Sequence, residues 1–129
     1  MRRFVYGKLV RNKILDDMIR HGEKPQYRVL DDKDYLIELQ KKILEEAAEI
    51  NFDDREKVLS ELADLQEVVD CMLEAINITT AELVKAKEKK NTRVGSFDKR
   101  IYIDDVSIPD ENPWINYLEK NSDRYPEIK

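Results

Sequence analysis

The chain has 129 residues, of which 41% are hydrophobic and 40% are charged, and its formal net charge is −5. This length suits one domain with a substantial core, and no apolar run approaches the roughly 18 residues that a membrane-spanning helix needs. The single cysteine cannot form an internal disulfide, which is typical of the reducing cytoplasm, so we expect a cytoplasmic protein. One cysteine and one histidine exclude a Cys/His zinc cluster, and three glycines exclude the glycine-rich nucleotide-binding motifs.

Apolar residues recur with the helical period of 3.6 in four segments, which cover about residues 12–21, 33–51, 54–77 and 80–91. The first helix is expected to end before Gly22. Only a few residues link the second and third helices, so these two must form an antiparallel hairpin. Asp53 and Glu56 are expected to form a capping box at the start of the third helix, and Thr79 and Glu82 one at the start of the fourth.

The remaining segments lack this periodicity. Residues 27–30 and 101–103 are rich in β-branched, aromatic and aliphatic side chains, which favours two short strands. Residues 104–129 contain three prolines and are expected to form an irregular C-terminal tail. The predicted fold class is therefore mainly all-α, with a helical hairpin and two flanking helices in a single domain over residues 1–129, whose core covers about 5–103.

Charge is unevenly distributed along the chain. The net charge is +5 over residues 1–28, −11 over 29–84, +5 over 85–100 and −4 over 101–129. This pattern is typical of solvated helix faces, but it also fits a metal-binding carboxylate centre between cations that hold an anionic substrate. A net acidic chain lacks the basic face that binds nucleic-acid polymers, so we expect no such partner.

Five acidic residues belong to the predicted hairpin: Glu45, Glu46, Glu49, Glu61 and Asp64. Glu46 flanks the apolar face of its helix, whereas Glu61 and Asp64 lie within the apolar arc of theirs, and the hairpin brings all five to within about two helical turns in height. Burying several carboxylates together costs free energy through desolvation and repulsion, so a positive charge must offset them. Carboxylates are ligands that Mg²⁺ and Mn²⁺ prefer, which makes a metal site one interpretation. The other is neutralisation by nearby basic side chains at the surface, namely Lys41, Lys42, Arg55 and Lys57.

Three blocks of sequence resemble one family. Glu-Glu-x-x-Glu at residues 45–49 and Glu-x-x-Asp at 61–64 resemble the motif of the MazG-like, all-α nucleoside triphosphate pyrophosphatase superfamily. Residues 8–14, Lys-Leu-Val-Arg-Asn-Lys-Ile, are similar to the opening of its phosphoribosyl-ATP pyrophosphohydrolase-like branch, which usually has Asp where this chain has Asn12. Residues 89–101 are similar to the ending of that branch, so the resemblance covers roughly residues 5–103.

The resemblance implies a MazG-like enzyme that assembles as a homodimer or higher homo-oligomer into a helical bundle. Such a hydrolase cleaves a nucleoside triphosphate between its α and β phosphates and releases a nucleoside monophosphate and pyrophosphate. It would bind Mg²⁺, or Mn²⁺ in its place, through Glu46, Glu49, Glu61 and Asp64. A carboxylate not fully used by the metal would orient or deprotonate the attacking water, and Glu45 and Glu49 are the candidates.

The two basic blocks supply cations that could bind the polyphosphate of a nucleotide substrate. The first-choice phosphate ligands are Lys8, Arg11 and Lys13. The second-choice ligands are Lys90, Arg93, Lys99 and Arg100. Each of these side chains could equally lie on a solvated face without a ligand.

Two other functions remain open at this point. One is a pyrophosphohydrolase for phosphoribosyl-ATP or another modified nucleotide, as the branch name suggests. The other is a non-catalytic helical assembly module whose acidic residues form only a surface. Wide apolar arcs on both hairpin helices favour at least a dimer in either case, because the short flanking helices cannot cover them.

Overall fold

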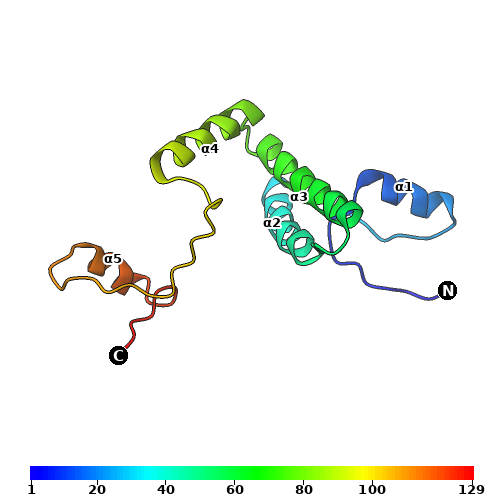
Figure 1. The fold of residues 1–129 in the computed structure, drawn as a ribbon. Helices are drawn as coiled ribbons and strands as arrows, with labels where there is room; N and C mark the ends of the chain where they lie inside the picture. Colours follow the sequence, from blue (N-terminus) through cyan, green and yellow to red (C-terminus); the bar gives the residue numbers. More distant parts are fainter. The chain divides into compact units, whose positions relative to one another are not determined.

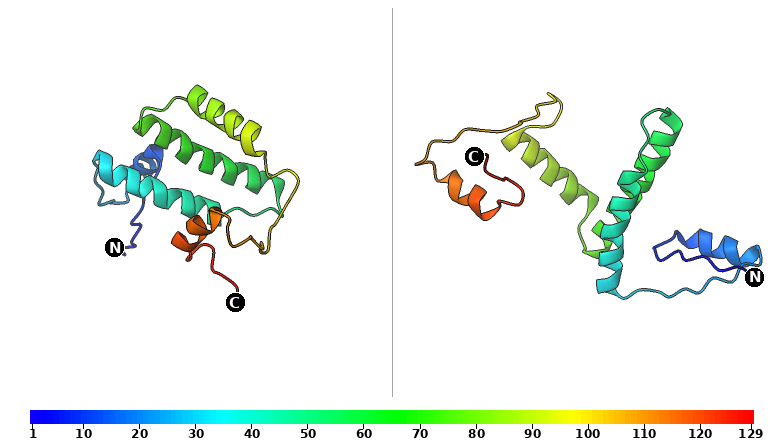
Figure 2. Two further views of the ribbon diagram at one scale, coloured as in Figure 1. Left: turned by 90° about the vertical axis from the view of Figure 1, so that its left-hand side faces the viewer. Right: turned by 90° about the horizontal axis from the view of Figure 1, so that it is seen from below.

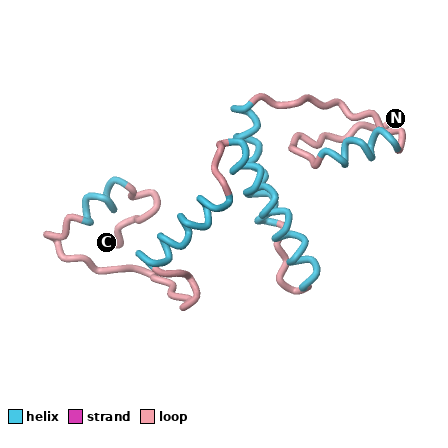
Figure 3. Tube along the Cα trace, turned by 90° about the horizontal axis from the view of Figure 1, so that it is seen from above, coloured by secondary structure: helices cyan, strands magenta, loops and turns pink.

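The computed structural model describes residues 1–129 and contains five α-helices and no strands, which confirms the predicted all-α class (Figures 1 and 3). The helices are α1 (Asn12–Arg20), α2 (Asp32–Ala48), α3 (Arg55–Ala75), α4 (Thr80–Val94) and α5 (Trp114–Lys120). The chain forms two compact units, Met1–Arg93 and Val94–Lys129. No helix combines the length and the hydropathy that a membrane span requires.

The predicted helical hairpin is present in the unit Met1–Arg93. Helices α2 and α3 lie side by side and run in opposite directions, joined by residues 49–54 (Figure 2). Only three apolar side chains are buried, namely Leu39 on α2 and Val68 and Leu73 on α3. The hairpin therefore has a narrow apolar seam, and much of the apolar surface predicted from its periodicity remains exposed.

Side-chain caps mark where α2, α3 and α4 begin. At the start of α4, the Thr79 Oγ1 atom accepts from the Glu82 amide at 3.1 Å, and the Glu82 carboxylate accepts from the Thr79 amide at 2.8 Å, which confirms the predicted capping box. The predicted cap of α3 is wrong by one residue. Asp54, and not Asp53, accepts from the amides of the first turn. Gly22 has a φ of +79° just beyond α1, as expected for a residue that ends a helix.

The two expected strands are absent. Residues 27–30 and 101–103 are neither helical nor paired with another strand. Their apolar side chains are largely solvated, with Val29 91% exposed and Tyr102 84% exposed. An isolated segment gains no strand structure from its composition alone, because the backbone hydrogen bonds of a strand need a neighbour.

The segment after residue 103 is more ordered than expected, because it contains the seven-residue helix α5. Within the unit Val94–Lys129, the Trp114 ring stacks on the Tyr117 ring with 4.6 Å between centroids. Tyr125 lies 6.1 Å from Tyr117 in a tilted arrangement. These aromatic contacts fold the C-terminal segment back onto α5.

Candidate functional site

Two ion pairs tie the basic N-terminal segment to the acidic hairpin. The Lys8 Nζ atom lies 2.9 Å from the Glu45 carboxylate of α2. The Arg11 guanidinium donates a hydrogen bond of 2.7 Å to the Asp64 carboxylate of α3. Because one contact reaches each helix of the hairpin, the segment just before α1 lies against both of them. The structure thus brings two predicted phosphate ligands to two of the predicted site carboxylates.

Glu46 is the one buried charged residue of the chain. It is 7% exposed, and its Oε2 atom is buried without any hydrogen-bond partner. Its Oε1 atom lies 3.5 Å from the Lys42 ammonium. Burial raises the pKa of Glu46, and the negative charges of Glu49 and Asp64 raise it further, although Lys42 opposes them. An unpaired buried carboxylate oxygen next to other acids attracts a cation.

The neighbouring Glu45 has the opposite environment. It accepts hydrogen bonds from Lys8 at 2.9 Å and from Lys42 at 3.2 Å. The hydrogen bond from Lys8 is the main cause that lowers the pKa of Glu45, and Lys42 adds to it. The same hydrogen bond raises the pKa of the Lys8 ammonium. Both side chains therefore remain ionised at neutral pH.

The other site carboxylates have partners of their own. Glu61 accepts a hydrogen bond of 2.7 Å from the backbone amide of Asn51, in the link between α2 and α3. Glu49 is exposed and is the C-cap residue of α2. No three Asp, Glu, His or Cys side chains converge closely enough to hold a metal ion. The physical reason is that Asp64, Glu45 and Glu61 each face another partner.

The remaining predicted phosphate ligands make no such contacts. Lys13 on α1 is exposed and forms no salt bridge. The second group is exposed and equally unpaired: Lys90, Arg93, Lys99 and Arg100. Of the four cations that the alternative interpretation named, only Lys42 contacts the candidate site acids, at 3.2 Å from Glu45 and 3.5 Å from Glu46, and its side chain is only 19% exposed. No residue pattern indicates the hydrogen bond from the Asn51 amide to Glu61, because its donor is a backbone group.

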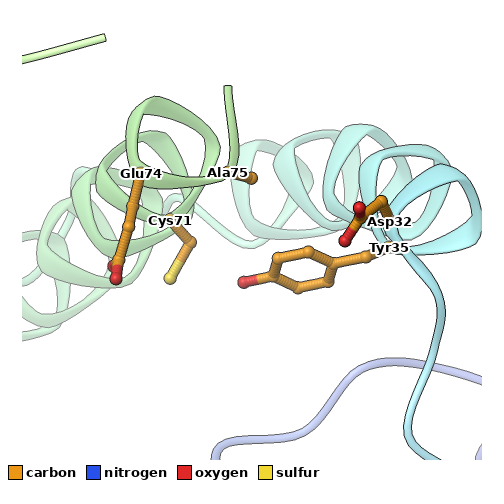
Figure 4. A pocket seen from close by; sticks show the side chains of 5 residues that line it. All are labelled: Asp32, Tyr35, Cys71, Glu74 and Ala75. Atoms are coloured by element: carbon orange, nitrogen blue, oxygen red, sulfur yellow. The ribbon is translucent and has the colours of Figure 1, made fainter. Parts of the chain in front are cut away.

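Two cavities flank Tyr35, which sequence reasoning missed as a site residue. One, of about 290 Å³, is lined by Asp32, Tyr35, Cys71, Glu74 and Ala75 (Figure 4). The Tyr35 hydroxyl points towards the Cys71 sulfur across it. Burial is the main cause that raises the pKa values of both Tyr35 and Cys71, so the thiol stays protonated and is no nucleophile at neutral pH.

The second cavity, of about 310 Å³, is lined by Leu9, Arg28, Val29, Leu30 and Tyr35. It carries no carboxylate, whereas the first cavity carries two. Comparisons with protein families, with curated proteins and with solved structures find no match to this chain.

Proposed function

We propose that the protein is a Mg²⁺-dependent nucleoside triphosphate pyrophosphohydrolase that releases a nucleoside monophosphate and pyrophosphate. The observation that carries the proposal is the meeting of the N-terminal cations with the hairpin acids, through Lys8 on Glu45 and Arg11 on Asp64. Phosphoryl chemistry needs cations for the phosphates and a hard metal ion beside them, with carboxylates to hold that ion. The motif resemblance at residues 8–14, 45–49 and 61–64 points to the same reaction.

The chemistry of the donor set suits a hard divalent cation, although the four side chains do not converge in this structure. Glu46, Glu49, Glu61 and Asp64 offer oxygen ligands only, and the buried Oε2 atom of Glu46 lacks any other partner. When bound, Mg²⁺ would neutralise charge on the phosphate oxygens. To bind it, Asp64 would have to exchange Arg11, and Glu61 would have to exchange the Asn51 amide.

Arg11 and Lys8 then have a defined role in binding. The planar guanidinium of Arg11 can grip two phosphate oxygens at once, and the Lys8 ammonium adds a point charge. The raised pKa of Lys8 keeps it cationic for this purpose. Lys13, the second residue of α1, is a third cation for a long polyphosphate.

Glu49 is the better candidate for the residue that accepts the proton of the attacking water. Glu45 is a poor base, because Lys8 and Lys42 lower its pKa. Glu49 is exposed and forms no ion pair, so it is free to contact water. In this step the water oxygen bonds to phosphorus, the bridging bond between the α and β phosphates breaks, and the water proton passes to the carboxylate.

A substrate panel tests the proposal. Purified protein with Mg²⁺ or Mn²⁺ is offered nucleoside and deoxynucleoside triphosphates, damaged forms of them and phosphoribosyl-ATP, and the products are separated. Monophosphate plus pyrophosphate is expected, and a preference for phosphoribosyl-ATP would favour the modified-nucleotide alternative. Glu61→Gln should abolish turnover, whereas Glu88→Gln on α4 should not change it. Orthophosphate as the only product, or full activity of Glu61→Gln, would contradict the proposal.

A non-catalytic assembly module is the second candidate. It is favoured by the many exposed apolar side chains and by the lack of three convergent carboxylates. Such a module would be indifferent to Mn²⁺ in a calorimetric titration, whereas the enzyme should bind the ion at the hairpin. In either case we expect a homodimer or higher homo-oligomer.

A further inference from the structure

The cavity beside Leu9 has the chemistry of a site for a flat, uncharged group. Its walls come from three segments: the N-terminal segment, the linker between α1 and α2, and the first turn of α2. Three aliphatic side chains and one tyrosine surround it, with Arg28 as the only charge. Its volume of about 310 Å³ lies at the small end of ligand sites, which is enough for one ring system but not for a whole nucleotide.

The cavity lies within reach of the hairpin carboxylates for a ligand the size of a nucleotide. Tyr35 in its wall and Glu45 both belong to α2 and are ten residues apart, or about 15 Å along the helix axis. Leu9, which also lines the cavity, directly follows Lys8, whose ammonium contacts Glu45. One short segment therefore reaches both the cavity and the acidic end of the hairpin. The separation is comparable with the length of an extended nucleoside triphosphate.

We infer that this cavity holds the base of the nucleotide substrate, with its face against the Tyr35 ring, while the phosphates lie at Lys8 and Arg11. Aromatic side chains stack on any base, and the Arg28 guanidinium can stack or donate to ring acceptors. The other cavity beside Tyr35 is less suitable, because Asp32 and Glu74 line it. This inference rests on the proposed function and adds Tyr35 as a base-binding residue.

Equilibrium binding separates the base from the phosphates. The ligands are α,β-methylene analogues of the four common nucleoside triphosphates, which keep the base but resist cleavage, and inorganic tripolyphosphate, which has no base. Tyr35→Leu removes the aromatic face and keeps a good helix former in α2. It should weaken binding of the preferred analogue at least about fivefold and leave tripolyphosphate binding unchanged. Tyr27→Leu, an exposed tyrosine outside both cavities, is the matched control and should change neither.

A second variant guards against damage to the fold. Val29 is 91% exposed, so Val29→Ser leaves the packing of the protein intact, yet it removes one apolar side chain from the rim of the cavity and should weaken the same analogue selectively. The inference is overturned if both variants bind the analogue normally, or if analogue and tripolyphosphate weaken equally. If the unaltered protein binds tripolyphosphate and binds no analogue more tightly than tripolyphosphate, the proposed base site is wrong but the proposed phosphate site is supported. If it binds neither ligand, the proposed function fails and the base site with it.

Discussion

Glu45 and Glu46 are adjacent in the chain but are held in opposite electrostatic states. Glu45 accepts from two lysines, whereas Glu46 is buried with one oxygen unpaired. Their pKa values consequently shift in opposite directions, downwards for Glu45 and upwards for Glu46. The contrast arises because α2 places Glu45 at the edge of its buried face and Glu46 within that face.

Replacement of Glu46 by glutamine should stabilise the protein at neutral pH by about 1 kcal/mol, or roughly 4 °C in melting temperature. Because its folded pKa is raised, the carboxylate of Glu46 costs stability once the pH exceeds the unfolded pKa, and the cost grows until the pH passes the folded pKa. Below the unfolded pKa both states are protonated, so the advantage of glutamine should vanish in acid. Thermal melts between about pH 3 and pH 7 measure this.

Glu45→Gln is the matched control, and its pH dependence has the opposite sign. The lowered pKa of Glu45 contributes stability above its unfolded value, and this contribution is lost as the pH falls through the folded pKa. The variant should therefore have a lower melting temperature than the unaltered protein at neutral pH, and the two melting temperatures should converge in acid. Identical pH profiles for the two variants would contradict the described environments.

Replacement of Arg11 by alanine should tighten Mn²⁺ binding while weakening nucleotide binding. Arg11 competes for an oxygen of Asp64 that the metal would need, and removal of an exposed ion pair of this kind changes affinity by up to about fivefold. Titration calorimetry without nucleotide measures the effect, and Arg11→Lys, which keeps the charge, should bind the ion nearly as the unaltered protein does. Weaker Mn²⁺ binding by the alanine variant would show that Arg11 supports the site instead of competing for it.

The residue at which a helix begins depends on which nearby side chain is free to accept hydrogen bonds from the amides of its first turn. The sequence favours Asp53 as the cap of α3, because Glu56 follows three residues later. In the structure the Asp53 amide donates to the Asn51 side chain at 2.9 Å, which holds Asp53 in a turn. Asp54, whose backbone is extended, then directly precedes the helix, and its carboxylate accepts from the Glu56 amide at 3.0 Å.

Asp54→Ala is expected to lower the free energy of unfolding by about 1 kcal/mol, since it leaves first-turn amides of α3 without a side-chain partner. Asp53→Ala removes the same type of side chain one residue earlier, where it accepts none of these amides, and should have little effect. Urea unfolding of both variants measures the difference. A larger loss of stability for Asp53→Ala than for Asp54→Ala would instead identify Asp53 as the cap, as predicted from the sequence.

Helix positions follow from sequence more directly than contacts between segments do. The 3.6-residue period identified four helices, and the few residues between the second and third required a hairpin. The strand prediction for residues 101–103 is wrong, because a strand-like composition does not provide a pairing partner. The helix α5 was not predicted, because prolines surround it in the sequence. The burial of Glu46 follows from its place near the apolar face. The pairing of Arg11 with Asp64 depends instead on the path of a non-helical segment, and such a segment has no hydrophobic periodicity from which its path could be predicted.

The whole molecule leaves much apolar surface in water. Leu44 on α2 and Leu59 on α3 are 69% and 67% exposed, although both belong to the packed hairpin. Side chains of this type stabilise a protein only when they are removed from water, so a second copy of the chain is the partner we expect on these helices.

Leu59→Asp should therefore reduce the mass measured by light scattering at micromolar concentration to that of a monomer. Val106→Asp adds the same charge at a position that is also 67% exposed, in the unit Val94–Lys129, and should leave the mass unchanged. A monomeric unaltered protein would contradict the expected assembly.

The two ion pairs of the N-terminal segment also make its attachment depend on ionic strength. Their side chains are partly exposed, from 28% for Glu45 to 58% for Arg11, so dissolved ions weaken them. Trypsin cleaves after lysine and arginine, so we expect the ion pairs of Lys8 and Arg11 to slow cleavage after these residues until salt weakens the contacts. Cleavage after these two residues should accelerate between about 0.05 M and 1 M NaCl relative to cleavage after Lys90, which forms no ion pair. Salt would then shift the first proteolytic cut from α4 towards the segment before α1.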